Sequence, residues 1–399
     1  MSFEDMDLLS LDVHTNDPEP FYEWLREERP LYYDKTNELW AVSRYDDVCY
    51  ISKHPELFCS GQGVIPNLPL DLWPDDAMIN KDGDAHTHQR KLVSKGFSPR
   101  RINEMGDKVR EITQELIDVI APKGEADLIG DVARPLPMRV IGDMLGYPRD
   151  RIDEVLSWTD TYTHAGCGPD HVTEEVQDAF ANFCEFHEEQ LEDRKANPGD
   201  DLISVWLKAE IDGDSLSEDT IMFEHNLLLV GGSETTRNSV GMGMIELMKN
   251  PDQQKWLVEN LDDPTAIEVA CEEMFRWSTP FVRMKRTLTQ DVELHGQTMK
   301  EGDQLVMLYP PASKDPRAYD KPNVFDIRRQ PKVAPLAFGY GAHFCLGANL
   351  ARIETRTMVE LLLRNFPDMH LQDGNPPEQR PSSFIRGYKT CPIAFTPKR

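Results

Sequence analysis

The sequence has few basic residues, no long hydrophobic run and no paired cysteines. Its 43 lysines and arginines stand against 70 aspartates and glutamates, which gives a formal net charge of −27. A chain this acidic repels phosphate backbones and anionic lipid surfaces, so we expect no nucleic-acid partner. No stretch approaches the roughly 18 apolar residues of a membrane span, so we expect no membrane anchor. The acidic start MSFEDMDLLSLDV also lacks the basic residues of a targeting peptide.

The seven cysteines are odd in number and form no CxxC pair. A disulfide framework or a paired-cysteine zinc site is therefore not expected, and the default location is the reducing cytoplasm. With 39% hydrophobic and 28% charged residues, the composition is that of an ordinary globular protein. No repeat, low-complexity segment or linker divides the chain, so we expect a single domain over residues 1–399.

Helical signals dominate the hydrophobic pattern. Apolar residues recur every three or four positions over residues 100–120, 136–146, 172–195, 218–250, 252–260, 264–277 and 346–365. Strand-like alternation is confined to residues 39–42, 287–294, 304–309 and 392–396. The predicted fold class is therefore mainly α with small β-sheets.

The longest predicted helix covers residues 218–250 and measures about 50 Å at 1.5 Å per residue. Its centre holds two adjacent glycines, Gly231 and Gly232, followed closely by Glu234 and Thr235. Each glycine costs roughly 1 kcal/mol relative to alanine inside a helix. One explanation is close helix packing with Glu234 on a wet face. The other is a notch that opens onto a buried ligand, with Glu234 and Thr235 at its edge to deliver protons.

Residues 338–347 read FGYGAHFCLG and directly precede a predicted helix. The glycines allow tight turns, and Cys345 lies near the helix N-terminus, where free N–H groups and the helix dipole favour a thiolate. Such a thiolate is a nucleophile or a metal ligand. The alternative is a buried structural cysteine.

A third feature is Glu273 and Arg276, an i, i+3 pair that by itself is typical of a surface ion pair. In order and spacing, these three features together resemble the cytochrome P450 superfamily. Phe338, Gly341, Cys345 and Gly347 are similar to its haem-binding loop, in which the cysteine thiolate is the axial iron ligand. The segment 231–235 resembles its oxygen-binding groove, and the Glu273 pair resembles its helix-K pair. The resemblance covers about residue 20 to residue 397 and is to the soluble bacterial branch.

The resemblance implies the cytochrome P450 fold, with a long central helix I and a haem-thiolate loop before helix L. It also implies haem b ligated by Cys345, with Glu234 and Thr235 as catalytic residues. The implied cofactor contacts are His86, Arg90, Gly231, Arg286, Phe338, His343 and Gly347. Arg329 is expected to complete a buried network with Glu273 and Arg276.

The activity implied is hydroxylation of an unactivated C–H bond with O2 and two electrons. Electrons are expected from a ferredoxin and its reductase, because no G-x-G-x-x-G after a strand is left for a fused reductase. Residues 90–110 hold seven basic and two acidic residues, a local charge of +5. We expect a monomer that docks an acidic ferredoxin through Lys95, Arg100, Arg101 and Arg352.

The predicted substrate pocket is apolar, which favours a hydrophobic small molecule. The sequence looks most like members that hydroxylate steroid side chains, with a cholesterol- or cholestenone-like substrate, or branched lipids. Alternatives are a monooxygenase of terpenoids or other secondary metabolites, a peroxygenase driven by H2O2, and a non-catalytic haem ligand binder. A peroxygenase would normally lack the Glu234-Thr235 pair. The expected walls are segment 61–82 with Leu227, Val230, Val282, Met284, Phe384 and Ile385.

Overall fold

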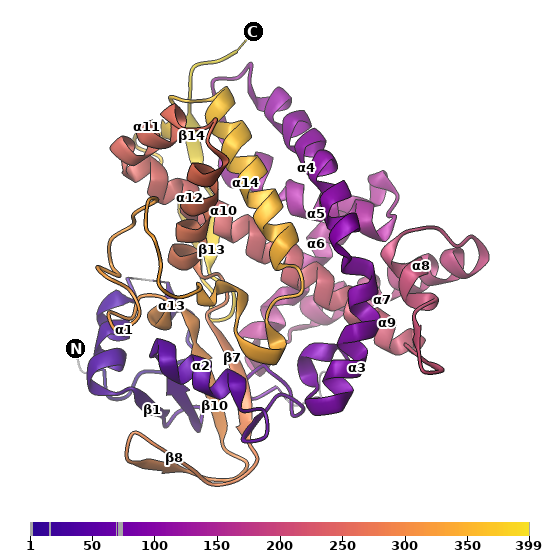
Figure 1. Cartoon of the computed structure of the whole chain (residues 1–399), viewed down its shortest axis with the longest axis vertical. Coiled ribbons are helices and arrows are strands. Elements are labelled where there is room, and N and C mark those ends of the chain that lie inside the picture. Colours follow the sequence, from indigo (N-terminus) through magenta and orange to yellow (C-terminus); the bar gives the residue numbers. More distant parts are fainter. Residues whose placement is uncertain (1–2, 16, 69, 71–74, 399) are drawn as a thin grey trace.

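The computed structural model describes residues 3–15, 17–68, 70 and 75–398. Helices make up most of these residues, and short strands form small sheets, the largest at the lower left of Figure 1. The predicted fold class, mainly α with small β-sheets, is therefore confirmed. Part of the predicted pocket segment 61–82, residues 69 and 71–74, lies outside the described residues.

The predicted helices all form, with boundaries displaced by no more than a turn. They are α4 (Pro99–Ile120), α5 (Pro135–Leu145), α7 (Glu174–Ala196), α11 (Pro251–Glu259), α12 (Pro264–Ser278) and α14 (Ala348–Asn365), together with the central helix described below. The remaining α-helices were not among the predicted segments: α1 (Glu19–Glu28), α2 (Tyr45–Lys53), α3 (Gly83–Val93), α6 (Ile152–Tyr162), α8 (Leu202–Leu207) and α13 (Tyr309–Ala312).

The largest sheet has the strand order β1-β2-β10-β7-β3. Its members are β1 (Leu31–Asp34), β2 (Leu39–Val42), β3 (Phe58–Cys59), β7 (Arg283–Leu288) and β10 (Gln304–Leu308). The smaller sheets use β4 (Glu125–Asp127), β5 (Glu210–Ile211), β6 (Asp214–Ser215), β8 (Val292–Leu294), β9 (Gln297–Met299), β11 (His370–Leu371), β12 (Glu378–Arg380), β13 (Gly387–Thr390) and β14 (Pro392–Ala394). Each predicted strand segment contains at least one of these strands.

The central helix is continuous but not uniform. It consists of α9 (Glu218–Leu229), a π-helical segment (Val230–Glu234) and α10 (Thr235–Lys249). Ser217 caps its start by accepting a hydrogen bond from the Thr220 N–H. The π-helical segment coincides with the glycine pair at the centre of the predicted helix, and such segments are frequent at functional sites.

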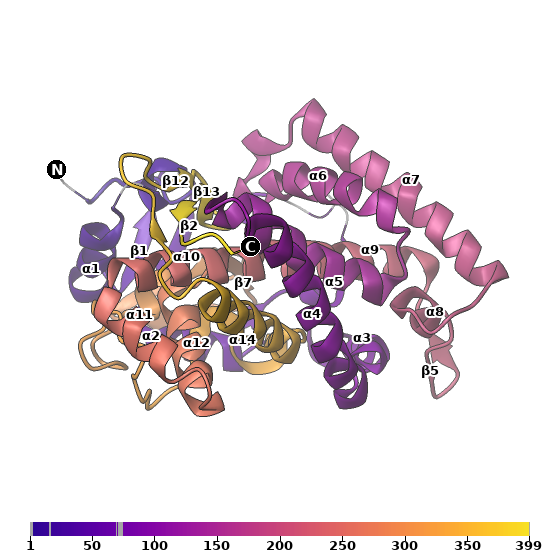
Figure 2. The ribbon, with the colours of Figure 1, turned by 90° about the horizontal axis from the view of Figure 1, so that it is seen from above.

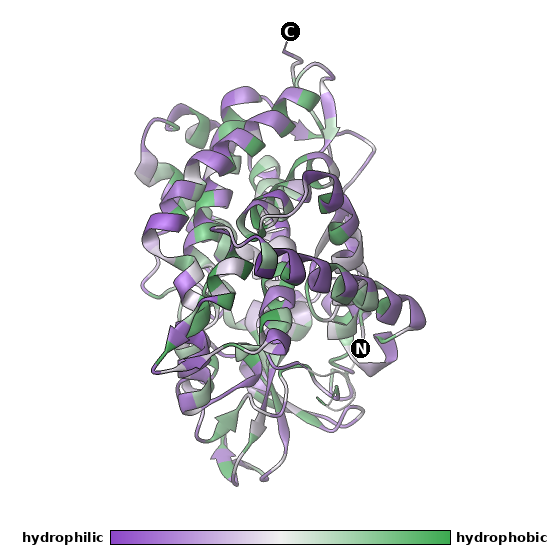
Figure 3. Cartoon of the chain, turned by 90° about the vertical axis from the view of Figure 1, so that its right-hand side faces the viewer, coloured by the Kyte–Doolittle hydropathy of each residue, from purple (hydrophilic) through white to green (hydrophobic). Residues whose placement is uncertain are grey.

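The central helix crosses the molecule beneath several others (Figure 2). Helix α10 packs against α12 and α14, and α14 in turn packs along α4, although more than 200 residues separate α4 from α14 in the sequence (Figure 1). Hydrophilic and hydrophobic residues are interleaved along the helices in Figure 3, as expected for helices with one face toward the core. Among the described residues, no helix is both long and apolar enough to span a membrane.

Candidate active site

A cavity of about 230 Å³ lies between the middle of the central helix and the loop that carries Cys345. Most of its lining is apolar. The members predicted from the sequence are Met78 and Ile79 of segment 61–82, Arg90, Leu227, Gly231, Thr235, Met284, Arg286, Phe338, His343, Cys345 and Gly347. The fold thus brings residues from distant parts of the chain together around one cavity.

Other residues predicted to line the pocket stand behind its wall. Phe384 and Ile385 form an apolar cluster with Cys167, against which Val230 and the pocket residue Met284 pack. Val282 is fully buried and donates its backbone N–H to the Phe384 carbonyl at 2.7 Å. These four predicted residues therefore support the wall rather than form it.

The loop before α14 folds under its own cysteine. The Cys345 N–H donates to the Phe338 carbonyl at 2.9 Å, and the Phe344 N–H donates to the Gly341 carbonyl at 3.1 Å. Gly341 adopts a φ of +70°, and a Cβ at this position would lie 2.3 Å from the Ser52 carbonyl oxygen. No other residue can occupy this turn without displacing α2. Cys345 lies three residues before Ala348, the first residue of α14, as predicted.

The exposed surface of Cys345 opens into the cavity. Burial raises the pKa of its thiol above the ordinary value, whereas the Gly347 N–H, Arg90 and Arg352 lower it. The helix dipole alone therefore does not produce the thiolate that we expected from the sequence. A coordinating metal cation does deprotonate a thiol outright, so this environment suits a metal ligand better than a free nucleophile.

Positive charge gathers at one side of the cavity without carboxylate partners. Among the described residues, neither Arg90 nor Arg286 forms an ion pair, although burial lowers the pKa of both guanidinium groups. His86 and His343 stack beside them with ring centroids 4.2 Å apart. The buried Nε2 of His86 has no hydrogen-bond partner among the described residues, while His343 Nε2 lies 3.2 Å from Ser60 Oγ.

Burial and these neighbouring cations lower the pKa of His343 to about 3. Buried, uncompensated cations indicate an anionic ligand, because an isolated buried charge is strongly unfavourable. Haem b carries two propionate groups, an apolar ring and an iron that accepts a thiolate. The described residues of the cavity fit all three features.

The two glycines of the central helix have different roles. A Cβ on Gly231 would meet no atom within 4 Å, because this residue faces open space at the cavity. A Cβ on Gly232 would lie 2.6 Å from Ile141 Cδ1 of α5. Gly231 therefore forms the predicted notch and Gly232 permits close helix packing, but the expectation of a wet face for Glu234 is wrong, because this residue is only 1% exposed.

Thr235 and Glu234 point toward different sides of the helix. Thr235 lines the cavity, and its Oγ1 donates to the Gly231 carbonyl. The Glu234 carboxylate is buried and accepts from the guanidinium groups of Arg237 and, at 2.8 Å, of Arg380. Burial, the largest effect, and nearby Asp160 raise the pKa of Glu234 to about 7. Near neutral pH this carboxyl can therefore both hold and release a proton.

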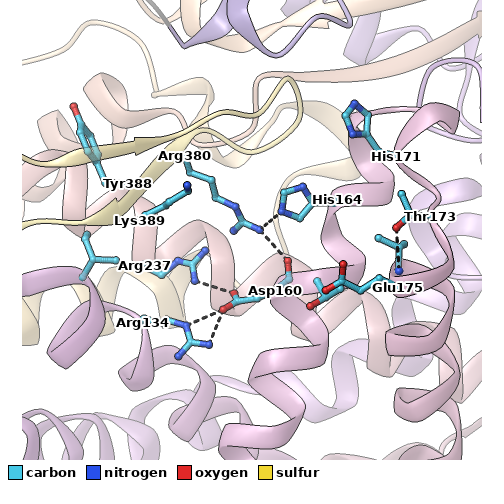
Figure 4. Close-up of a pocket in the computed structure, with 13 residues that line it drawn as sticks. Arg134, Asp160, His164, His171, Thr173, Glu175, Arg237, Arg380, Tyr388 and Lys389 are labelled. Atoms are coloured by element: carbon cyan, nitrogen blue, oxygen red, sulfur yellow. Dashed lines mark hydrogen bonds and ion pairs between the residues drawn. The ribbon is translucent and has the colours of Figure 1, made fainter.

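The partners of Glu234 line a second, polar pocket of about 500 Å³ (Figure 4). There Arg134 and Arg237 both bind the Asp160 carboxylate, at 2.7 Å and 2.9 Å. Arg380 donates to the Asp160 carbonyl and to His164 Nε2, both at 2.9 Å. Glu234 therefore lies between the cavity that holds Thr235 and a pocket lined by charged, hydrogen-bonded groups.

The predicted Glu273 network is present and deeply buried. Arg276 makes two hydrogen bonds to the Glu273 carboxylate, both at 2.7 Å, and Arg329 Nε makes a third at 2.9 Å. The Asp326 N–H donates to the same carboxylate at 2.9 Å. Both Glu273 and Arg276 are almost completely buried, unlike the surface pair that their spacing alone would indicate.

Most residues of the predicted docking surface are engaged with other groups. Arg100 pairs with Glu104 at 2.8 Å, and Arg352 pairs with Glu272 at 2.6 Å. Lys95 and Arg101 donate to backbone carbonyls, those of Glu210 and Asp200. The local charge of +5 counted along residues 90–110 also omits acidic residues that the fold brings in from distant segments, since Arg110 pairs with Glu360 at 2.6 Å and Lys108 with Asp143 at 3.5 Å.

Sequence reasoning missed several charged residues around these cavities, among them Asp160, Glu224, Glu354 and Arg380. Glu224 and Glu354 line the cavity itself, and both are nearly fully buried. A charged residue inside the apolar stretch of a predicted helix was the available signal for Glu224. Arg380 lies in a short strand of no distinctive pattern, so nothing in the sequence marked it.

Comparison with known proteins agrees with this geometry. The sequence profile of the family "Cytochrome P450" matches residues 138–392. The steroid C26-monooxygenase of Mycolicibacterium smegmatis is 39% identical over 381 residues, covering 94% of this chain and 92% of that protein. The methyl-branched lipid omega-hydroxylase of Mycobacterium bovis is 36% identical over 417 residues, covering 98% and 95%.

Solved structures give the same picture at the level of the fold. CYP109E1 from Bacillus megaterium, in complex with testosterone, superposes with a TM-score of 0.84 at 29% identity and covers 95% of this chain and 99% of that one. The cytochrome P450 from Chondromyces apiculatus superposes with a TM-score of 0.88 at 28% identity, with complete coverage of both chains.

Proposed function

Because this chain belongs to the cytochrome P450 family of haem-thiolate monooxygenases, we propose that it hydroxylates an unactivated C–H bond of a steroid side chain or a methyl-branched lipid. The observation that carries this proposal is the cavity that places Cys345 opposite the Gly231 notch and Thr235 between largely apolar walls. An apolar cavity with few polar groups suits a hydrophobic substrate. The curated relatives with those two activities cover nearly the whole chain.

We assign Cys345 as the residue that would bind the iron of haem b, and the bound cofactor would supply reductive activation of O2. Arg90, Arg286, His86 and His343 would hold the propionates, because the two guanidinium groups form no ion pair and His86 Nε2 has no hydrogen-bond partner among the described residues. Phe338 and Gly347 would shape the thiolate side of the ring, and Gly231 would leave room on the opposite side.

Glu234 and Thr235 are proposed to deliver the protons of the reaction. The Glu234 carboxyl would take its proton from the polar pocket, which Asp160, His164 and Arg380 line. Thr235 presents its hydroxyl to the cavity. The hydrogen bond from Thr235 to the Gly231 carbonyl fixes that hydroxyl at the notch. The pair therefore spans the wall between the two cavities.

Replacing Thr235 with alanine should uncouple electron consumption from hydroxylation, lowering product per electron pair about tenfold or more and releasing peroxide instead, because proton delivery is lost. The measurement compares reduced cofactor consumed with product and peroxide formed. Thr235→Ser keeps the hydroxyl and should retain most of the coupling. Glu234→Gln should slow turnover without changing substrate affinity. Unchanged coupling in Thr235→Ala would remove this residue from proton delivery.

We also propose that the chain works as a monomeric single haem domain in the cytoplasm, reduced by a ferredoxin and its ferredoxin reductase. The chain as a whole is acidic, but the segment that joins α3 to the start of α4 is basic. We propose that Lys95, Arg100 and Arg101 of this segment contact the acidic carrier. Arg352 would contribute from α14. Complementary charge of this kind chiefly accelerates association.

The function is tested by adding candidate substrates to the haem-loaded enzyme and following its Soret band. We expect cholest-4-en-3-one or a methyl-branched fatty acid to shift the band. We also expect turnover with a surrogate ferredoxin system to give a product hydroxylated at the end of the substrate's own side chain or acyl chain. A terpenoid that binds far more tightly than both would reassign the substrate class. Efficient turnover with H2O2 alone would point to a peroxygenase.

A further inference from the structure

Glu224 is a buried acid in the wall of the haem cavity that no step described above uses. It lies on α9, is only 2% exposed, and lines the same cavity as Cys345 and Thr235. Carboxylates are seldom buried without a cation to pair with. Among the described residues, no cation forms an ion pair with Glu224.

One oxygen of this carboxyl ties three segments of the chain together. Glu224 Oε1 accepts from the Met78 N–H at 2.6 Å and from the Gln89 side-chain amide of α3 at 2.7 Å. The same amide nitrogen donates to the Asp76 carbonyl at 2.9 Å. Since Met78 and its neighbour Ile79 line the cavity, Glu224 holds part of the wall that a substrate would touch.

The second oxygen of Glu224 is left for the cavity. No described residue donates a hydrogen bond to Oε2, and this oxygen is not fully buried. Of the carboxyl group, Oε2 is therefore the atom in reach of water when no ligand fills the cavity.

The charges that face Glu224 come from two elements beside it. Asp75, Asp76 and Lys81 belong to the segment around Met78, and Arg90 belongs to α3. Lys81 already pairs with Asp76 at 2.9 Å. Burial, the largest effect, and nearby Asp75 raise the pKa of Glu224 to about 7, against the opposing hydrogen bonds and Lys81.

We propose that Glu224 is a positioning residue for the Met78–Ile79 wall and that filling the cavity with an apolar ligand couples to uptake of a proton by its carboxyl group. The ligand displaces water from Oε2, and a carboxylate that loses its water is destabilised relative to the neutral acid. Either form keeps the two hydrogen bonds at Oε1, because a carbonyl oxygen accepts them as a carboxylate does.

The direction of the pH dependence follows from this argument. Ligand binding raises the Glu224 pKa above its value in the free enzyme, which is already about 7. Affinity is therefore full below the free pKa and is lost as the pH rises through the pKa of the complex. Between about pH 6 and about pH 8.5 the dissociation constant should increase roughly three- to tenfold.

The test uses haem-loaded enzyme and cholest-4-en-3-one, a probe that has no titratable group of its own. The dissociation constant is measured across this pH range from the Soret shift. Calorimetry near pH 7.5 in two buffers of different ionisation enthalpy then counts the protons taken up. We expect a substantial fraction of one proton for the wild type and almost none for Glu224→Gln, an uncharged near-isostere that keeps an acceptor oxygen.

Glu354→Gln is the matched control, because Glu354 lines the same cavity, is equally buried and has a pKa that burial raises to about 8. If Glu224 is the responsible group, this variant keeps the proton uptake of the wild type. Proton uptake that persists in Glu224→Gln, or that disappears in Glu354→Gln, would overturn the proposal. A structural role alone would weaken binding in Glu224→Gln equally at every pH.

Only the choice of probe rests on the proposed function. If cholest-4-en-3-one binds at no pH, the proposed substrate class fails, and the same proton count is made with 4-phenylimidazole, which needs only the haem and the cavity. Comparison of wild type with Glu224→Gln cancels the titration of the imidazole itself. The difference in proton uptake between the wild type and Glu224→Gln then tests the proton coupling.

Discussion

Cys345→Ala is expected to abolish the long-wavelength Soret band that a thiolate ligand gives the reduced carbonyl complex, and to abolish monooxygenase activity with it. Cys345 is the cysteine that lines the cavity among the described residues. No other side chain on the loop side can supply the electron donation that a thiolate gives the iron. The absorption spectrum of the reduced, carbon monoxide-treated protein is the measurement.

The groups proposed to bind the propionates at the other side of the cavity make this result specific. Arg90, Arg286 and His343 remain in Cys345→Ala, so the variant should still take up haem, with weaker retention and without the thiolate spectrum. Cys49→Ala, which alters a half-buried cysteine of α2, should leave the spectrum unchanged. A thiolate spectrum that survives in Cys345→Ala would show that another residue binds the iron.

Glu273→Ala is expected to lower the free energy of unfolding by about 3–5 kcal/mol, because it leaves buried charge without a partner. The Glu273 carboxylate accepts from Arg276, from Arg329 and from the Asp326 N–H. Arg276 is only 2% exposed, so water cannot replace the lost carboxylate. Chemical denaturation, with the midpoint and slope compared to the wild type, measures the effect.

The neighbouring residue provides a control on the same helix. Glu272 pairs with Arg352 at 2.6 Å, but both side chains are more than a fifth exposed. Pairs near the surface contribute at most about 1 kcal/mol, so Glu272→Ala should be nearly neutral. Equal losses for the two substitutions would show that burial of the Glu273 network does not determine its contribution.

Several features followed from the sequence alone. The helical period, the glycine pair and the loop before α14 predicted the long central helix, its notch and the place of Cys345. These features are local: they depend on spacing along one helix or one turn. The spacing of Glu273 and Arg276 also predicted their contact, although the same spacing at a surface would have looked identical.

Other features depended on packing between distant segments. The basic segment 90–110 appeared as an excess of positive charge, yet Arg110 pairs with Glu360 and Lys108 pairs with Asp143, so acids from α14 and α5 reduce it. A charge count along the chain cannot include partners that only folding supplies. Likewise Val230, Phe384 and Ile385 are apolar and near the cavity, but they stand behind its wall.

The environment of the ionisable groups also came only from the tertiary structure. Residues from α6, α10 and β12 surround Glu234, and residues from the Met78 segment and α3 surround Glu224. A sequence shows where an acidic residue occurs but not how deeply it is buried, and burial is the largest effect on the pKa of both carboxyls. The sequence by itself therefore determined where Cys345, Glu234 and Thr235 lie along their loop and helix, because helix period and turn geometry are local properties. Only the tertiary structure decided which acids stay protonated near neutral pH, because desolvation depends on every element packed around a group.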